Sequence, residues 1–282
     1  MKKLAFALMM VAGFASCDSD DDGVDIPFEG ETKEYTLNTI GDSGVSGTVT
    51  FNENEDGSTT VEFDLEGTEE GNLHPAHIHM GTAVEGGEIA VTFEPIDGAT
   101  GMSTTEVSSL DDETSITYEE LVAYDGYINV HLSQDDLPTI VAQTDIGGNA
   151  LTGESVSYDL NEMDIAGVSG VAVFEERENG ETLATLDLDG TTEGGSHPAH
   201  IHVGSVEDAP GAIAITFNPV NGATGMSMTN IAMTDGTEEE EGEAITYEDL
   251  LTYNGYINVH ASADDLETLA AQGNMGANAS EE

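Results

Sequence analysis

The sequence predicts a mainly β protein built from two tandem antiparallel Greek-key β-sandwich or barrel domains, each with one short helix. Three observations support this fold class: the chain repeats itself, many segments alternate apolar and polar residues, and turns rich in Gly, Asn and Asp separate those segments. At 282 residues, the chain is long enough for two domains that each bury a core.

The internal repeat consists of blocks that return in the same order. GVSGTVTF at 44–51 returns as GVSGVAVF at 167–174, a displacement of 123 residues (44 to 167). Insertions raise the displacement to 129 residues (126 to 255) at the block GYINVH. Because insertions between matching blocks mark surface loops, we predict domains over 30–150 and 153–278, joined by the Gly-rich GGNALTG.

One short helix is predicted in each domain. TYEELVAY carries a capping-box pattern, with Thr117 three residues before Glu120, and its copy pairs Thr246 with Asp249. The segment DDLPTIVAQ that follows is compatible with either a helical turn or a strand. The remaining segments, such as SGTVTF and YINVH, favour β-branched and aromatic residues and are predicted to be strands.

The N-terminus has the pattern of a signal peptide over 1–16, with Lys2 and Lys3 before a short apolar stretch. Cys17, the only cysteine of the chain, follows small residues and resembles the lipidated first residue of bacterial lipoproteins. The acidic tether over 17–29 resembles the export signal of surface-exposed lipoproteins of the Bacteroidetes group. We therefore expect a lipid-anchored protein of the outer membrane, exposed at the cell surface. A secreted protein with an unmodified cysteine is the alternative.

The strongly acidic composition restricts the classes of molecule that the protein can bind. Four Lys and Arg stand against 57 Asp and Glu, so the formal net charge is −53. Such a surface repels nucleic acid and anionic substrates, and it attracts cations. The acidic surface is equally understandable as a solubility adaptation to salty surroundings. No protein partner can be named from these patterns.

Histidines cluster in the block HPAHIHMG, which returns as HPAHIHVG. In a strand, successive side chains point to opposite faces. Ile78 then shares the core face with Ala76 and Met80, whereas His77 and His79 share the outer face. These two imidazoles are expected to point toward solvent.

The same parity applies to GYINVH. Ile128 and Val130 are expected to point inward, and Tyr127, Asn129 and His131 outward. If the two strands are neighbours, three imidazoles per domain meet on the outer wall. The predicted metal ligands in both domains are His77, His79, His131, His200, His202 and His260.

Neutral imidazoles suit copper or zinc, so the sequence predicts a Cu or Zn site in each domain. His74 and His197 precede prolines and could add ligands from the rim of the cluster. Met102 and Met226, in twin GATGMS stretches, could add thioether donors or simply pack under a loop. The alternative is that the histidines are structural and hydrogen-bond loops across the sheet.

HPAHIHMG followed by GYINVHLS resembles the chordin-type CHRD domain, and both copies carry both blocks. This resemblance implies an extracellular β-sandwich whose biochemical role is poorly defined. The H-x-H strand is also distantly similar to the copper-binding strand of Cu/Zn superoxide dismutase, which implies copper ligation by the histidines. The chain departs from that family, because it has no zinc subloop, no second cysteine for a disulfide, and Arg177 in one repeat only.

The function expected from these patterns is metal capture or buffering outside the cell by two histidine-cluster modules. One alternative is a non-catalytic adhesion or scaffold module with structural histidines. The other is a copper enzyme similar to superoxide dismutase, which the acidic field disfavours for an anionic substrate. An enzyme is the less favoured interpretation, and no catalytic residue is predicted.

Overall fold

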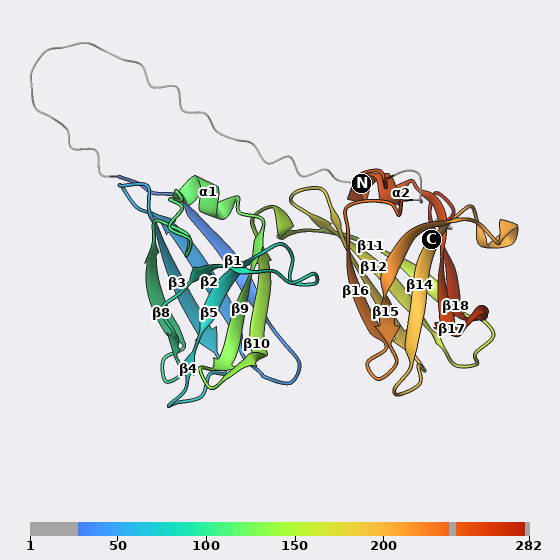
Figure 1. The fold of residues 1–282 in the computed structure, drawn as a ribbon, viewed down its shortest axis with the longest axis horizontal. Helices are drawn as coiled ribbons and strands as arrows, with labels where there is room; N and C mark the ends of the chain where they lie inside the picture. Colours follow the sequence, from blue (N-terminus) through green and yellow to red (C-terminus); the bar gives the residue numbers. More distant parts are fainter. Residues whose placement is uncertain (1–27, 237–240, 280–282) are drawn as a thin grey trace, which may run out of the picture.

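The computed structural model describes residues 28–236 and 241–279, so the predictions for the signal peptide and for Cys17 lie outside the described residues. Within them, the protein is mainly β and forms two antiparallel sheets, one curved into a half-barrel and the other into a nearly closed barrel (Figure 1); both are called barrels below. The predicted fold class is confirmed. One sheet is formed by residues before 147 and the other by residues after 150.

The first sheet contains ten strands. They are β1 (Thr32–Thr39), β2 (Ser46–Glu53), β3 (Thr59–Glu66), β4 (Leu73–His74), β5 (Ala76–Met80), β6 (Ile89–Thr92), β7 (Ile96–Asp97), β8 (Met102–Val107), β9 (Gly126–Ser133) and β10 (Asp136–Ile146). Their order across the sheet is β4-β7-β8-β3-β2-β1-β10-β9-β5-β6. The chain therefore crosses from β3, on one side of β1, to β5 on the other, which makes β5 a neighbour of β9.

The second sheet repeats this order with eight strands. They are β11 (Leu151–Glu162), β12 (Ser169–Arg177), β13 (Thr182–Asp189), β14 (Ser196–Val203), β15 (Ile213–Asn221), β16 (Met226–Ile231), β17 (Asn254–Ser262) and β18 (Asp265–Gly276). The order is β15-β14-β17-β18-β11-β12-β13-β16. The two end strands, β15 and β16, lie against each other and nearly close the barrel.

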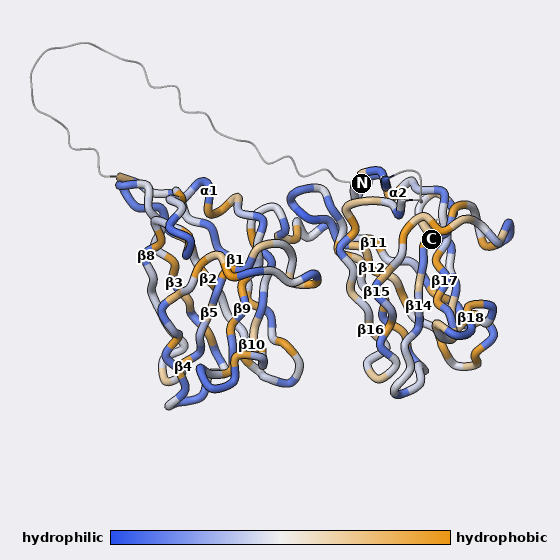
Figure 2. The backbone as a smooth tube through the Cα atoms, in the orientation of Figure 1, coloured by the Kyte–Doolittle hydropathy of each residue, from blue (hydrophilic) through white to orange (hydrophobic). Residues whose placement is uncertain are grey.

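Each barrel encloses its own apolar core, as alternation along the strands requires. Along β3, Val61, Phe63 and Leu65 are buried in the core, whereas the residues between them are partly or fully exposed. The tube in Figure 2 shows the same alternation of apolar and polar residues on both barrels. Burial of each large apolar side chain contributes about 1.5–3 kcal/mol, and these contributions hold the two sheets closed.

Both predicted short helices are present as α1 (Tyr118–Val122) and α2 (Tyr247–Leu251). In each, the predicted capping box forms: the hydroxyl of Thr117 or Thr246 accepts the amide of the residue three positions on, whose carboxylate accepts the cap amide. The ambiguous segment after β9 is strand β10, because it pairs with both β9 and β1. None of the helices in the described ranges has the length and apolar character needed to cross a membrane.

The two barrels are joined through a buried ion pair. Arg177, at the end of β12, is fully buried, and its guanidinium lies 2.8 Å from the carboxylate of Asp145 in β10. It also donates to the carbonyl of Asn149 and, through Nε, to the side chain of Asn230 at 2.8 Å. Two backbone hydrogen bonds cross the same joint, from the amides of residues 178 and 179 to the carbonyls of residues 150 and 148. These contacts fix the second barrel against the end of the first.

Candidate metal centre

The H-x-H strand and the GYINVH strand are neighbours, as the prediction required. Strand β5 pairs with β9 so that His77 lies opposite Asn129 and His79 lies opposite Tyr127. The amide of His131 donates to the carbonyl of Pro75 at 2.9 Å, which places the third histidine beside the start of β5. Strand parity therefore brings the three imidazoles to one face of the sheet, as predicted.

The burial of this face differs from the prediction in two respects. Met80 was expected in the core, but it lies at the last position of β5 and is 45% exposed. The histidines were expected to face solvent, yet His77 and His131 are 9% and 7% exposed. The carbonyls of Gly87, in the residue 81–88 loop, and of Leu137, near the start of β10, accept from His79 and His131, and the cluster is a recessed site.

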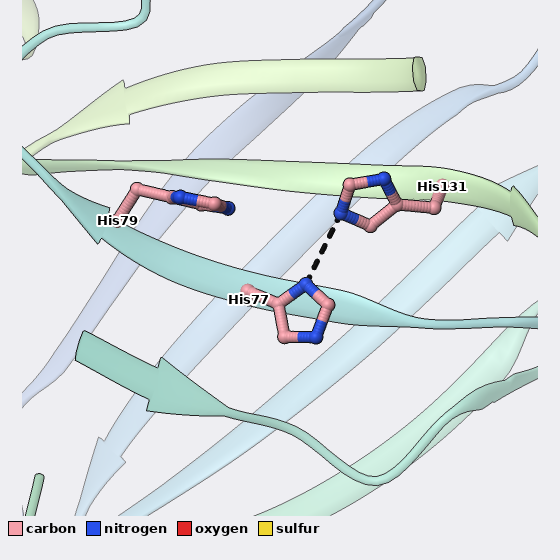
Figure 3. Close-up of side chains that lie close together, drawn as sticks. All are labelled: His77, His79 and His131. Carbon is pink, nitrogen blue, oxygen red and sulfur yellow. Dashed lines mark hydrogen bonds between the residues drawn. The ribbon is translucent and has the colours of Figure 1, made fainter. Parts of the chain in front are cut away.

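The imidazoles converge in both barrels. One ring nitrogen from each of His77, His79 and His131 lies within 4.8 Å of the other two. Figure 3 shows the three rings close together, with a dashed line from His77 to His131. The line joins His77 Nδ1 and His131 Nε2, which are 3.1 Å apart. The equivalent trio in the second barrel is His200, His202 and His260. Among the described residues, these are the two groups that meet the geometry of a metal site.

The hydrogen bonds of the first trio determine where its protons are. A carbonyl oxygen only accepts, so His131 Nδ1 carries a proton that it donates to Leu137, and His79 Nδ1 donates to Gly87 at 2.9 Å. The Nε2 atoms of both neutral rings therefore hold lone pairs. Without a metal, His77 Nδ1 donates to His131 Nε2.

His79 Nε2 is buried, and no hydrogen-bond partner for it occurs among the described residues. A buried acceptor without a partner is costly, and a metal ion supplies the missing interaction. Moving the His77 proton from Nδ1 to Nε2 gives three lone pairs directed at one point. Three nitrogens bound to one ion at 2.0–2.1 Å lie roughly 3.3–3.6 Å apart. His77 Nδ1 and His131 Nε2 are 3.1 Å apart and would separate slightly, whereas a separation near the 4.8 Å limit would shorten by about 1 Å.

The second barrel repeats this arrangement closely. His260 Nδ1 donates to Leu266 at 2.8 Å, and His202 Nδ1 donates to Gly211 at 2.9 Å. His200 Nδ1 and His260 Nε2 are 3.1 Å apart, and His202 Nε2 is buried without a partner within the described ranges. The two clusters are thus equivalent in tautomer and in the direction of their lone pairs.

The electrostatics keep these rings neutral. Burial, joined by the neighbouring His131 and His79 and opposed by Asp111, lowers the pKa of His77 to about 4. Burial also lowers the pKa of His131, although its hydrogen bond to Leu137 opposes the shift. Burial, followed by repulsion from the neighbouring histidines, likewise lowers the pKa of His200. Since only the neutral form binds a metal, the clusters are ready to bind at neutral pH.

A tyrosine ring stacks against one histidine of each cluster. The ring of Tyr127 stacks on His79 with centroids 4.9 Å apart and an interplanar angle of 15°, and Tyr256 stacks on His202 at 5.1 Å and 16°. The hydroxyl of Tyr256 accepts the Gly211 amide at 2.7 Å, and Gly211 in turn accepts from His202. Both tyrosines were predicted to point outward, and they do, but they are buried against the imidazoles.

The two remaining histidines lie behind the clusters. His74 Nδ1 lies 3.0 Å from the carbonyl of His131, and His197 Nδ1 lies 3.1 Å from the carbonyl of His260. Both rings are buried, and neither belongs to a converging trio. They hold the backbone of the third ligand in place, and their role as additional ligands stays a prediction.

The two methionines lie outside the histidine trios. Met102 is in β8 and Met226 is in β16; both side chains are exposed, and neither strand carries a histidine of a trio. Met226 lines a cleft between the barrels whose walls include none of the histidines. Arg177 is buried in the joint and is not part of either cluster.

Sequence reasoning missed the groups that orient the imidazoles. The carbonyls of Gly87 and Leu137 set the tautomers, and Asp111, which accepts from the amide and hydroxyl of Thr92, provides a negative charge near His77. Backbone carbonyls carry no sequence signal. The Thr–Asp pair does return, as Thr216 with Asp235 in the second barrel.

Three neutral nitrogen ligands leave a fourth coordination position for water or another ligand, as at open zinc sites. Imidazole nitrogens favour copper and zinc, whereas calcium and magnesium prefer oxygen ligands. The geometry therefore supports binding of a nitrogen-seeking transition metal. Comparison with models of known protein families and with curated proteins finds no match for this chain.

Proposed function

We propose that the protein captures or buffers copper or zinc outside the cell, with one ion in each histidine trio. The observation that carries this proposal is the convergence of three ring nitrogens within 4.8 Å, in both barrels. The Nε2 atoms of His79 and His202 are buried without a hydrogen-bond partner among the described residues, so their lone pairs are available to an ion. The Nε2 atoms of His74 and His197 are unpartnered as well but belong to no trio, so the convergence of the nitrogens carries the proposal.

The charge of the chain suits this role. A formal net charge of −53 raises the local concentration of cations, while the imidazoles select transition metals over calcium and magnesium. The site is recessed but not sealed, since His79 and His200 remain partly exposed. An ion can therefore reach the nitrogens through small movements of the covering loops.

The cellular setting belongs to the same proposal. We propose that Cys17 is lipidated and that the acidic tether holds two CHRD-like barrels at the outer surface of the outer membrane. A lipid anchor would keep captured metal near the cell. Radiolabelled fatty acid incorporated by the intact protein and lost in Cys17→Ser would support the anchor, and equal labelling of both proteins would rule it out.

Elemental analysis of the chain from Asp18 onward, purified without added histidines, tests metal binding. After incubation with Cu or Zn and removal of free metal, we expect two ions per chain. His79→Ala and His202→Ala each remove an unpartnered ligand, and each is expected to lower the stoichiometry to one. The variant with both changes is expected to retain none.

Circular dichroism is the control for folding in these variants. Loss of metal with unchanged strand signal supports the proposal. Two folded barrels that take up neither Cu nor Zn would overturn it, and the histidines would then be structural parts of an adhesion or scaffold module. Retention of both ions after the double change would place the metal elsewhere.

A further inference from the structure

The two barrels differ on one outer face, and the difference is large. Strands β2, β3 and β8 in the first barrel have the same pairing register as β12, β13 and β16 in the second, so their positions correspond one to one. Outward-facing threonines of the first barrel are replaced by apolar residues in the second. In order, Thr48, Thr50, Thr60 and Thr104 correspond to Val171, Val173, Leu183 and Met228.

Contact between the barrels explains only part of this change. Leu183 lies between residues of both barrels and is 5% exposed although it is not part of its own core. Met228, however, remains 43% exposed. Two apolar neighbours that are apolar in both repeats, Met226 and Leu151 at the start of β11, are also 43% exposed. Neither barrel covers these side chains.

The exposed apolar residues line a cleft between the barrels. Its volume is about 870 Å³, within the range of small-molecule sites. The opposite wall comes from the first barrel and includes Ile40 at the end of β1 and Val84 in the loop after β5. The buried Arg177–Asp145 pair fixes the distance between the walls, so the cleft is preformed.

The corresponding surface of the second barrel has no facing wall. Its groove is lined by Ser157, Asp159 and Met163, which occupy the positions of Glu34, Thr36 and Ile40. It has a volume of about 670 Å³, and all of its lining residues come from one barrel. A ligand that contacts both barrels at once can therefore bind in the cleft but not in this groove.

The charges at the cleft select the ligand. Three carboxylates line it, those of Glu34, Glu175 and Glu178, against the ammonium of Lys33. Asp145 also lines it, but its charge is neutralised by Arg177. The net negative charge of the walls adds to the acidic field of the whole chain and repels an anion.

We propose that the cleft binds a small amphiphilic cation, with an apolar body against Met226, Met228 and Leu151 and a positively charged group near the carboxylates. This site is separate from the histidine clusters and does not depend on metal binding. Met228 distinguishes this face from that of the first barrel, where Thr104 stands at the same position.

Isothermal titration calorimetry of the metal-free full chain tests the proposal with three probes that share an eight-carbon tail. They are octyltrimethylammonium, octanol and octanesulfonate; the quaternary ammonium group cannot coordinate a metal. We expect one saturable site per chain for the cation, about tenfold weaker binding of the alcohol and no binding of the anion. Absence of saturable cation binding would overturn the proposal, and equal binding of all three probes would overturn its charge selectivity.

Matched variants locate the site. Met226→Thr and Met228→Thr are each expected to weaken cation binding about tenfold, the loss expected for one buried apolar contact. Met102→Thr, at the position corresponding to Met226, should leave binding unchanged. Threonine at residue 104 is compatible with the same strand position, so the Met228→Thr variant is expected to fold. Equal losses in Met102→Thr and Met226→Thr would show that binding is not in the cleft.

Discussion

Replacing Arg177 by Asn is expected to loosen the joint between the barrels. Arg177 is fully buried, and its counterpart in the first barrel is Asn54. The two residues occupy the same kind of turn, because the backbone amide of each donates to the carbonyl four residues ahead. Its partner Asp145 has a neutral counterpart too, Asn274 in β18. Asparagine is therefore compatible with both positions in a barrel that has no neighbour there.

The size of the effect follows from what the change leaves behind. The Asp145 carboxylate, 11% exposed, would lose its only cation, and the Asn149 carbonyl would lose a donor. Removing one partner of a buried ion pair costs about 3–5 kcal/mol. In Arg177→Asn/Asp145→Asn no charge remains buried, so the cost is expected to fall to about 1–2 kcal/mol.

Native-state hydrogen exchange measures this loss at the joint. The amides of Glu178 and Asn179 donate across the joint to the carbonyls of Ala150 and Gly148 at 2.9 and 2.8 Å. A loss of about 3 kcal/mol accelerates their exchange by roughly 100-fold in the single variant, and the double variant recovers most of the protection. The amide of Leu65, bonded within the first barrel, is the internal control.

Two results would refute this reasoning. If the single variant exchanges at the wild-type rate, the ion pair contributes nothing to the joint. If the double variant exchanges as fast as the single variant, the cost arises from lost packing of the Arg177 side chain and not from an unpaired buried charge.

Three further predictions concern the first barrel. Tyr127→Leu removes the ring stacked on His79 and is expected to weaken metal binding at that site about tenfold, measured by competition with a chromogenic chelator while the second site serves as control. Thr117→Ala removes the helix cap and is expected to lower the free energy of unfolding by about 1 kcal/mol in urea titrations, with no change in metal affinity. The folded pKa of His77, about 4, lies below its unfolded value of 6.5, so the neutral ring stabilises the metal-free protein fully above pH 6.5. That contribution is lost as the pH falls from 6.5 toward 4, and a midpoint of urea unfolding that stays constant across this interval would contradict it.

The outcome for the histidines shows what strand parity can predict. Alternation alone placed His77 and His79 on the face opposite Ile78, and the pairing of β5 with β9 brought His131 beside them. Parity does not reveal what covers a face. The burial of these rings depends on the path of the loop after β5 and the turn after β9, which tertiary contacts determine. The prediction that Met80 lies in the core was wrong for a related reason: Met80 is the last residue of β5, and alternation does not predict burial where a strand ends.

Arg177 was the feature that sequence patterns could not interpret. Its partner Asp145 lies 32 residues away in a stretch with no motif, so nothing local indicates a pair. Comparison of the repeats position by position does contain a signal, because Arg177 and Asp145 are both replaced by asparagine at the unjoined ends, Asn54 and Asn274. A neutral residue in one repeat is thus replaced by a positive residue in the other, and a second neutral residue by a negative one. This is the pattern expected where the two repeats contact each other.

The same comparison explains how the barrels can share a metal centre and differ elsewhere. The tautomers of the ligands are set by backbone carbonyls, those of Gly87 and Leu137 in the first barrel and of Gly211 and Leu266 in the second. These interactions depend on the path of the chain and not on the surface side chains. The outer face of β12, β13 and β16 therefore differs from that of the first barrel while both histidine trios keep the same hydrogen bonds, so one repeated framework carries two equivalent trios and a single cleft between the barrels.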